Sequence, residues 1–119
     1  MSFSFDIAPR RSDEEALRRL ALRQAILRKV NEAMRGAPGE PLVAVRCECG
    51  QLGCNQLIQL APAEYEAVRG HARRFAIVAG HAVVEIEDAI ERHDRYAVAQ
   101  VRAPVAIAIA EATSPRRAL

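Results

Sequence analysis

The sequence predicts an α+β fold in which a long N-terminal helix packs on a small, mainly antiparallel sheet, with a zinc-binding turn at the tip of a hairpin. Three observations lead to this prediction. Residues 13–35 carry apolar side chains at helical spacing, residues 42–60 hold two short apolar runs, and all three cysteines lie between those runs. With 119 residues and 50% hydrophobic content, the chain can bury one modest core, so we expect a single domain over residues 1–119.

The helix over residues 13–35 has signals for a start and a stop. Ser12 can cap its first turn, with Glu15 three residues later as the partner in a capping box. Polar Gln24 interrupts the apolar stripe, and Gly36 is a natural end. The stripe itself comprises Leu17, Leu20, Leu27, Val30 and Met34.

Two further features flank this helix. Leu22 and Ile26 lie off the stripe and form a weaker apolar edge, which could meet a partner chain or more of the same domain. Residues 1–11 show no clear period and contain a proline, so they are predicted to be a flexible arm. The arm lacks the apolar run of a signal peptide, and no segment reaches bilayer-spanning length, so we expect a cytoplasmic protein.

The rest of the chain alternates short strands with short helices. Pro62 opens a second helix, which is expected to end near Arg74, and Pro104 opens a third. The tail after that third helix is predicted to be frayed. In order, we expect strands at 42–47 and 56–60, a helix from 62, a strand at 75–79, a short helix at 87–93, a strand at 96–101, a helix at 104–112 and the tail at 113–119.

The cysteines form one cluster, CECGQLGCN, over residues 47–55. Thiolates this close repel one another unless a cation compensates them, and an odd number of cysteines cannot all pair as disulfides. Gly50 and Gly53 allow a sharp turn that can aim Cys47, Cys49 and Cys54 at one point. These features predict a metal site, and thiolate ligands favour zinc.

Tetrahedral zinc needs a fourth ligand, and the chain offers His71, His81 and His93. We favour His81 because it follows Gly80 at the end of a predicted strand. An edge strand beside the hairpin would bring that end to the cysteines. His71 lies near a helix end and His93 in a charged stretch, where histidines are usually exposed.

Other readings of the cluster remain open at this point. Three ordinary buried cysteines, a redox pair formed by Cys47 and Cys49, or an iron–sulfur centre are each conceivable. A closed Cys3His site has no open position for water, so we expect the zinc to be structural. Glu48 lies between two ligands and cannot readily reach the metal, and no deaminase-like motif accompanies the cysteines.

Several stretches together resemble a group of small uncharacterised proteins of actinobacteria. Their pattern runs CECG-x3-C, a strand, EYEAVR, a strand, PGH and a strand that bears a tyrosine; residues 47–54, 60–69, 79–81 and 91–101 match it here. The N-terminal helix also has the group's Asn31-Glu32 pair. Ala61 and Ala79 depart from the usual Thr and Pro. The resemblance implies that Cys47, Cys49, Cys54 and His81 form the site, and it implies no activity.

The charges give little support to other functions. Net charge is only +2, although the first helix has a basic face on which Arg23, Arg28 and Lys29 lack an acid four residues earlier. The acidic stretch at 85–94 lacks calcium-loop spacing. Because no phosphate loop or hydrolase signature is present, a non-enzymatic role is expected.

The leading hypothesis is therefore a zinc-binding regulatory or protein-interaction module that binds a protein partner. The alternatives are a DNA-binding regulator that uses Arg23, Arg28 and Lys29, and a thiol redox sensor that releases zinc on oxidation.

Overall fold

The computed structural model describes residues 11–35 and 39–116, and within these ranges the predicted α+β class is confirmed. Most of the predicted arm, residues 1–10, and the end of the predicted tail, residues 117–119, lie outside the described residues. The elements are α1 (Arg11–Met34), β1 (Val43–Arg46), β2 (Leu57–Leu60), α2 (Pro62–Arg69), β3 (Arg74–Ile77), β4 (Glu87–Arg92), β5 (Ala97–Val101) and α3 (Pro104–Ala112).

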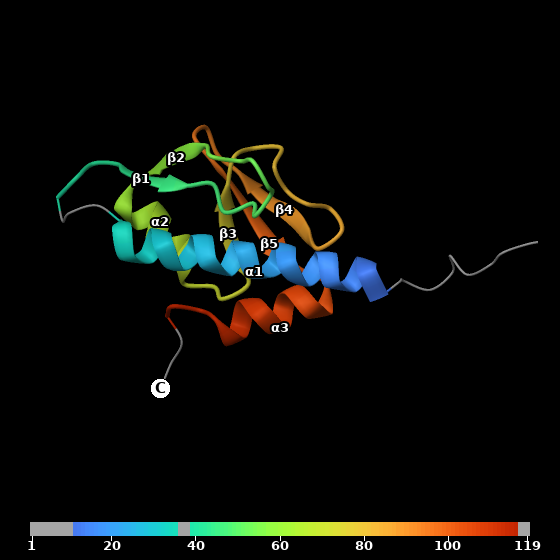
Figure 1. Ribbon diagram of the computed structural model, residues 1–119. Helices are drawn as coiled ribbons and strands as arrows, with labels where there is room; N and C mark the ends of the chain where they lie inside the picture. Colours follow the sequence, from blue (N-terminus) through green and yellow to red (C-terminus); the bar gives the residue numbers. More distant parts are fainter. Residues whose placement is uncertain (1–10, 36–38, 117–119) are drawn as a thin grey trace, which may run out of the picture.

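The strands of the described residues form two small antiparallel sheets rather than the one predicted. β1 and β2 make a hairpin in which Val43 faces Leu60 and Arg46 faces Leu57. The second sheet has the order β3-β5-β4, so β3 is an edge strand. In Figure 1, α1 runs across the molecule with the strands above it and α3 below it. α1 and α3 run in the same direction and pack on each other.

The predicted short helix at 87–93 is wrong, because this segment is strand β4. Its Glu, Ala and Arg residues favour a helix locally, but its backbone pairs with β5 over most of its length. A register shift between Ala89 and Glu91 marks a bulge in the strand. Helix α2 also ends at Arg69 rather than near Arg74, which is already the first residue of β3.

The buried face of α1 differs from the predicted stripe. Leu20 is buried, but Met34 is 73% exposed. The face that packs on the rest of the protein instead comprises Leu20, Ala21, Gln24, Ala25, Arg28 and Asn31. The helix also begins at Arg11, so Ser12 lies inside it rather than at its cap. Three of these six buried residues are therefore polar, and each of the three forms hydrogen bonds described below.

Candidate metal centre

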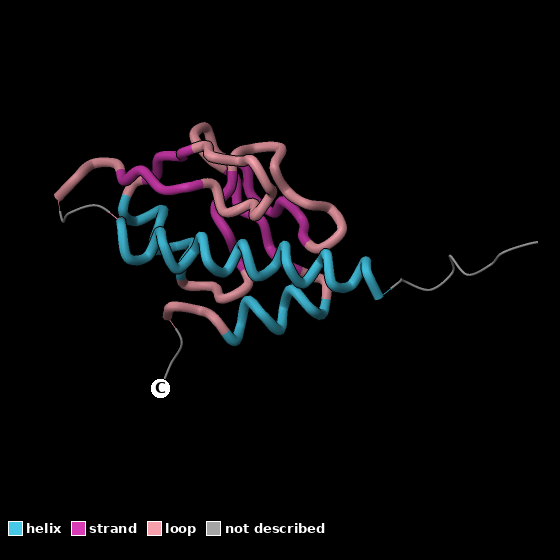
Figure 2. The backbone as a smooth tube through the Cα atoms, viewed as in Figure 1, coloured by secondary structure: helices cyan, strands magenta, loops and turns pink. Residues whose placement is uncertain are grey.

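The structure brings Cys47, Cys49, Cys54 and His81 together. The three cysteines lie in the connection between β1 and β2, residues 47–56, which we call the cysteine turn. His81 lies just after β3, the edge strand beside this turn. In Figure 2 both segments are loops above the middle of α1. The three sulfur atoms and a ring nitrogen of the histidine all lie within 4.8 Å of one another.

The four donor atoms lie close enough together to hold one metal ion. The Nδ1 atom of His81 lies 3.6 Å from the Sγ atom of Cys47 and 3.6 Å from that of Cys54. Zinc–sulfur bonds of about 2.3 Å and zinc–nitrogen bonds of about 2.0 Å, at the tetrahedral angle, separate sulfur from nitrogen by about 3.5 Å. These two distances are close to that separation, and Nδ1 is the nitrogen that would bind the ion.

Backbone N–H groups point at the sulfur atoms. The amide of Val78 donates to Cys47 Sγ at 3.2 Å, and that of Gln51 faces Cys49 Sγ at 3.5 Å. Three thiolates carry one more negative charge than a zinc ion compensates. With a zinc ion bound, these backbone donors would offset the excess charge and fix the orientation of the ligands.

The acidity of the three thiols differs with their burial. Burial raises the pKa of Cys47 to about 12 and also raises the pKa of Cys49. Cys54 is partly exposed, and although burial opposes it, the amide of Gln56 and the charge of Arg46 lower its pKa. The buried pair would stay protonated at neutral pH on its own. The charge of a bound cation is what would deprotonate both thiols.

Glycines let the cysteine turn close and let it approach α1. Gly50 and Gly53 have φ angles of +74° and +84°, the region in which side chains are disfavoured. A Cβ atom on Gly50 would also lie 2.8 Å from Gln24 Cγ and 2.9 Å from the carbonyl oxygen of Leu20. Arg23 Nε donates to the Gly50 carbonyl oxygen at 2.6 Å. The turn is thereby seated directly on the first helix.

Glu48 supports the site from inside, a role that the sequence analysis missed. It is fully buried, and both of its carboxylate oxygens lie 2.9 Å from Arg69 Nη2. Its backbone amide donates to the Ala76 carbonyl oxygen at 2.8 Å, and its Oε1 atom accepts from the Ala76 amide at 2.9 Å. Glu48 thus pairs with the free edge of β3 as a further strand would. A residue between two inward-facing ligands points to the other side of an extended chain, so its position alone did not indicate burial.

Asn31 joins this network to α1. Its side chain exchanges two hydrogen bonds with the backbone of Arg46, each 2.9 Å long. Its amide nitrogen also donates to Glu48 Oε2 at 2.8 Å. The Arg69 side chain lies over the Tyr65 ring, 4.9 Å from its centroid, and the Tyr65 hydroxyl donates to Glu32. Helices α1 and α2 therefore hold the cysteine turn through buried polar groups.

The three residues considered as nucleic-acid or partner contacts, Arg23, Arg28 and Lys29, do not form one exposed basic face. Arg28 is only 1% exposed and donates to the carbonyl oxygens of Ala72 and Ala110, at 2.5 and 2.7 Å. Its guanidinium also lies over the Phe75 ring. The prediction that Arg28 contacts nucleic acid is therefore wrong, because the side chain is inside the protein. Arg23 binds the cysteine turn, and only Lys29 is exposed.

The other two histidines lie outside the group of four. His71 is exposed in the turn after α2. His93 stacks on the Tyr96 ring, with 4.5 Å between centroids, and its Nε2 atom lies 2.9 Å from Glu91 Oε1. Both are surface histidines, as expected. Among the described residues, the Cys3His set is the group of potential ligands close enough to hold a metal ion.

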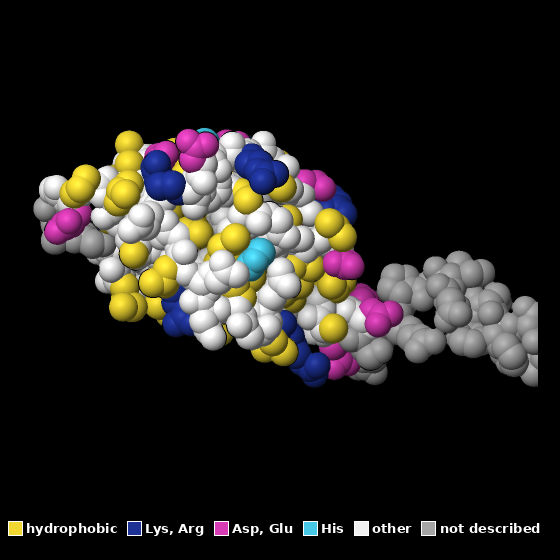
Figure 3. All heavy atoms as spheres, turned by 90° about the horizontal axis from the view of Figure 1, so that it is seen from above, with side chains coloured by type: hydrophobic (Ala, Val, Ile, Leu, Met, Phe, Trp, Pro, Cys, Tyr) yellow, Lys and Arg dark blue, Asp and Glu magenta, His cyan; other side chains and the backbone are white. Residues whose placement is uncertain are grey.

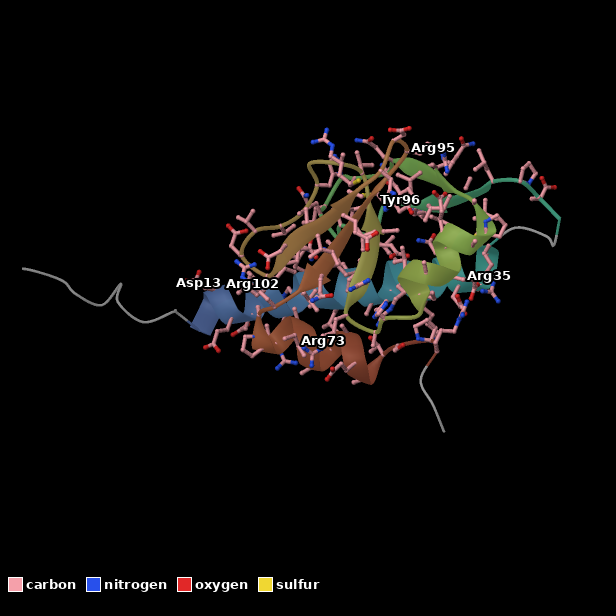
Figure 4. All side chains as sticks on the ribbon, turned by 180° about the vertical axis from the view of Figure 1, so that it is seen from behind. Asp13, Arg35, Arg73, Arg95, Tyr96 and Arg102 are labelled. Carbon is pink, nitrogen blue, oxygen red and sulfur yellow. The ribbon has the colours of Figure 1, made fainter. Side chains whose placement is uncertain are left out.

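The acidic stretch at 85–94 contains one buried carboxylate. Glu87 is fully buried and accepts hydrogen bonds from Gln24 Nε2 at 2.7 Å and from the Val83 amide at 2.9 Å. Burial raises its pKa. Asp88 lies on the surface beside Arg102, one of several arginines that form ion pairs there. Figure 4 shows Arg35, Arg73, Arg95 and Arg102 spread around the molecule, each with a nearby carboxylate partner.

No protein-family model, curated protein or solved structure matches this chain. Kinship with the actinobacterial group therefore stays a prediction from the sequence. None of the helices in the described part of the chain is both long enough and apolar enough to cross a bilayer.

Proposed function

We propose that Cys47, Cys49, Cys54 and His81 bind one zinc ion, and that the protein is a non-catalytic regulatory or interaction module shaped by that ion. The observation that supports this best is the position of His81 Nδ1, 3.6 Å from two of the three sulfur atoms. That position completes a set of one nitrogen and three sulfur donors, the ligand types that structural zinc prefers.

A structural role for the ion fits the surroundings better than a catalytic one. Four protein ligands fill a tetrahedral shell and leave no position for a water molecule. The carboxylate nearest in sequence, Glu48, is turned away from the ligands and is bound by Arg69 and Asn31. It is therefore not placed to act as a general base.

Zinc would join two parts of the fold. Three ligands come from the tip of the β1–β2 hairpin and the fourth follows β3, so the ion would fix one sheet against the other. Figure 3 looks down on the side of the molecule that includes this junction. Hydrophobic and uncharged atoms form the middle of that face, and charged side chains gather at its margins. This distribution is typical of protein-binding surfaces.

The resemblance to the actinobacterial group is part of the proposal. Three of its sequence segments meet in the structure: Asn31 from the first helix, Glu48 from the cysteine motif and Arg69 from the EYEAVR motif are hydrogen-bonded in one buried network. A pattern whose separate pieces hold one site together is more specific than any piece alone.

The two alternatives receive less support. For a DNA-binding regulator, Arg28 is buried and Arg23 is engaged, which leaves Lys29 as the exposed member of the predicted trio. For a redox sensor, Cys47 and Cys49 are 2% and 0% exposed, so an oxidant would have to reach the site through partly exposed Cys54. The sensor hypothesis still predicts zinc release by mild peroxide and recovery on reduction.

Metal analysis of the purified, untagged protein tests the proposal. We expect about one zinc ion per chain, with the content sharply reduced in the Cys54→Ser and His81→Ala variants. His93→Ala is the matched control and should keep its zinc, because His93 lies outside the ligand group. A folded protein that contains no metal would refute the proposal.

A further inference from the structure

The four candidate ligands are not held equally firmly. Cys47 and Cys49 are buried in the cysteine turn, and Glu48 between them is fixed by buried hydrogen bonds. His81 instead lies partly buried in a short connection that follows β3. We call residues 79–82 the His81 strap. Movement of this strap alone would separate the fourth ligand from the other three.

The two ends of the strap are anchored to the fold. Before it, the amide of Val78 donates to Cys47 Sγ at 3.2 Å. After it, the amide of Val83 donates to Glu87 Oε2 at 2.9 Å, and the carbonyl oxygen of Val83 accepts from the Glu87 amide at 3.0 Å. The strap therefore spans two fixed points, and its freedom to move lies between them.

One side chain connects the middle of the strap to another element. Among the described residues, the strap backbone forms two hydrogen bonds, both at His81. Its amide donates to the Val78 carbonyl oxygen at 3.0 Å, which closes a local turn. Its carbonyl oxygen accepts from Gln51 Nε2 at 3.0 Å, and Gln51 belongs to the cysteine turn. The backbone amide of Gln51 also faces Cys49 Sγ, so this residue contacts both sides of the metal centre.

Open space on two sides of the strap gives it room to move. Gly80 lines both a hollow of about 490 Å³ toward α1 and a hollow of about 430 Å³ toward β4. It is exposed, and no atom lies within 4 Å of the point where its Cβ atom would be. Ala79 and Ala82 pack against the buried cysteines, but such small side chains offer little apolar surface to hold the strap. The strap can therefore swing outward without displacing a neighbouring helix or strand.

We infer that the His81 strap is the gate through which the metal ion is exchanged, and that Gln51 is the positioning residue that keeps this gate closed. The inference rests on the proposed function, because it names how that metal centre is regulated. Opening the strap would remove the nitrogen donor and leave three sulfur donors on the cysteine turn. The fourth coordination position would then accept a ligand from outside, such as a chelator. With Gln51 in place the histidine is ordered before the ion binds, which lowers the entropic cost of binding.

Zinc transfer from the loaded, full-length protein to a chromogenic chelator tests the gate. Because the strap must open before the chelator reaches the ion, the rate measured by stopped-flow absorbance should level off at high chelator concentration. That plateau equals the rate of opening. Gln51→Ala should raise it about tenfold, since side chains that orient a metal ligand typically change metal affinity by at least that factor. Gln51→Met, which keeps the side-chain length without a donor, should do the same.

A matched control and a second measurement separate positioning from a general loss of stability. Gln59→Ala changes an exposed glutamine of β2 outside the metal centre and should leave the plateau unchanged. In hydrogen exchange of the zinc-loaded protein, followed by mass spectrometry, Gln51→Ala should lower protection over residues 79–82 but not over β5. A fall in protection throughout the chain would overturn the positioning role.

Two other results would overturn the inference. A transfer rate that rises in proportion to chelator concentration, without a plateau, would show direct attack on the bound ion beside partly exposed Cys54. An unchanged plateau in the Gln51→Ala variant would show that another contact keeps the strap closed.

The zinc content of the wild-type protein separates this inference from the proposed function. Folded protein without zinc would refute the metal centre and the gate together. Zinc-loaded protein that shows no plateau, or no response to Gln51→Ala, would refute the gate and leave the metal centre intact.

Discussion

Gly50 is the residue at which the cysteine turn touches α1, and this makes it different from Gly53. Both have positive φ angles, but only Gly50 lies against neighbouring atoms, whereas Gly53 has open space where a Cβ atom would go. Gly53→Ala should therefore cost only the backbone strain, about 1–2 kcal/mol. Gly50→Ala should cost that strain plus the displacement of α1, a further 1–3 kcal/mol or so.

Urea denaturation of the two variants, both loaded with zinc, measures this difference in the free energy of unfolding. The two glycines provide controls for each other because their φ angles are similar. Equal losses of stability would show that the turn is not seated on Leu20 and Gln24 as described.

The ligands of the candidate site could be predicted from the sequence, but the buried polar residues that hold the cysteine turn in place could not. Three clustered cysteines and a histidine after a strand are rare enough to be informative. Arg28 was assigned to a basic face because charged side chains on a helix usually face water, and nothing local marked Asn31 as buried. Their burial depends on carbonyl oxygens and a carboxylate that other elements supply, and no local pattern in α1 reveals those partners. For Glu48, the sequence analysis expected correctly that the carboxylate does not reach the metal ligands, but it missed the buried bonds to Arg69 and Asn31.

At the scale of elements, ion pairs join the described segment after α3 to two helices. Arg116 donates to Glu32 on α1 and to Glu66 on α2, at 2.5 and 2.7 Å. The frayed tail over residues 113–119 stays a prediction, and residues 117–119 lie outside the described part. One guanidinium that bridges two carboxylates holds the tail across two helices.

The ion pairs of Arg116 with Glu32 and Glu66, which we call the Arg116 clamp, should break in acid. The hydrogen bond from Arg116 lowers the pKa of Glu66; burial raises the pKa of Glu32, but hydrogen bonds from Arg116 and Tyr65 outweigh burial and lower it. A carboxylate with a depressed pKa stabilises the fold above its ordinary value of 4.5 and loses that contribution as the pH falls through the lower, folded value. The contribution should therefore begin to fall below pH 4.5, and the tail should detach once the pH is below the lower, folded pKa values.

Amide relaxation measured by NMR for residues 113–116 reports the detachment. Arg116→Gln should release the tail at neutral pH as well, and Arg73→Gln, which removes an ion pair on the side of α3, should not. Added salt should weaken the clamp, because these groups are partly exposed. A tail that stays rigid both at pH 3 and in the Arg116→Gln variant would contradict the clamp.

Element type could be predicted wherever the local pattern and the final environment agree. The β1–β2 hairpin, α2 and α3 follow from β-branched runs and from prolines at first turns, and the structure has them close to the expected positions. Strand β4 was mispredicted because its helix-favouring residues pair with β5, and this long-range pairing overrides a local preference. The prediction of the buried face of α1 was wrong for a related reason. Polar Gln24 is buried because its side chain donates a hydrogen bond to Glu87, a residue distant in the sequence.

At the scale of the whole molecule, removal of the metal should destabilise some parts of the fold more than others. Zinc removed by a chelator should free the cysteine turn from His81 and loosen the β1–β2 hairpin. The pairing of β3 with β5 involves none of the ligands and should persist longer. Structural zinc in small domains contributes about 10 kcal/mol or more of folding free energy, so a large fall in Tm should accompany the change.

Hydrogen exchange with and without chelator, followed by mass spectrometry, checks this order. Protection should fall first over residues 43–60 and last over β5. The His81→Ala variant should resemble the chelated protein, and His93→Ala should resemble the untreated one. Uniform loss of protection, or none, would contradict the uneven response.

The pairing of Glu48 with β3 has a consequence for the tendency of the chain to aggregate. Without Glu48 in this position, whose carboxylate accepts from the Ala76 amide and whose backbone amide donates to the Ala76 carbonyl, the strand edge would offer both groups unpaired to another chain. The exposed strand would present Phe75, Ala76, Ile77 and Val78, an uncharged run that favours β-aggregation. Because Glu48 lies between two of the cysteines, assembly of the metal centre would also close this edge. Metal supply would then determine how long a newly made chain remains prone to aggregate.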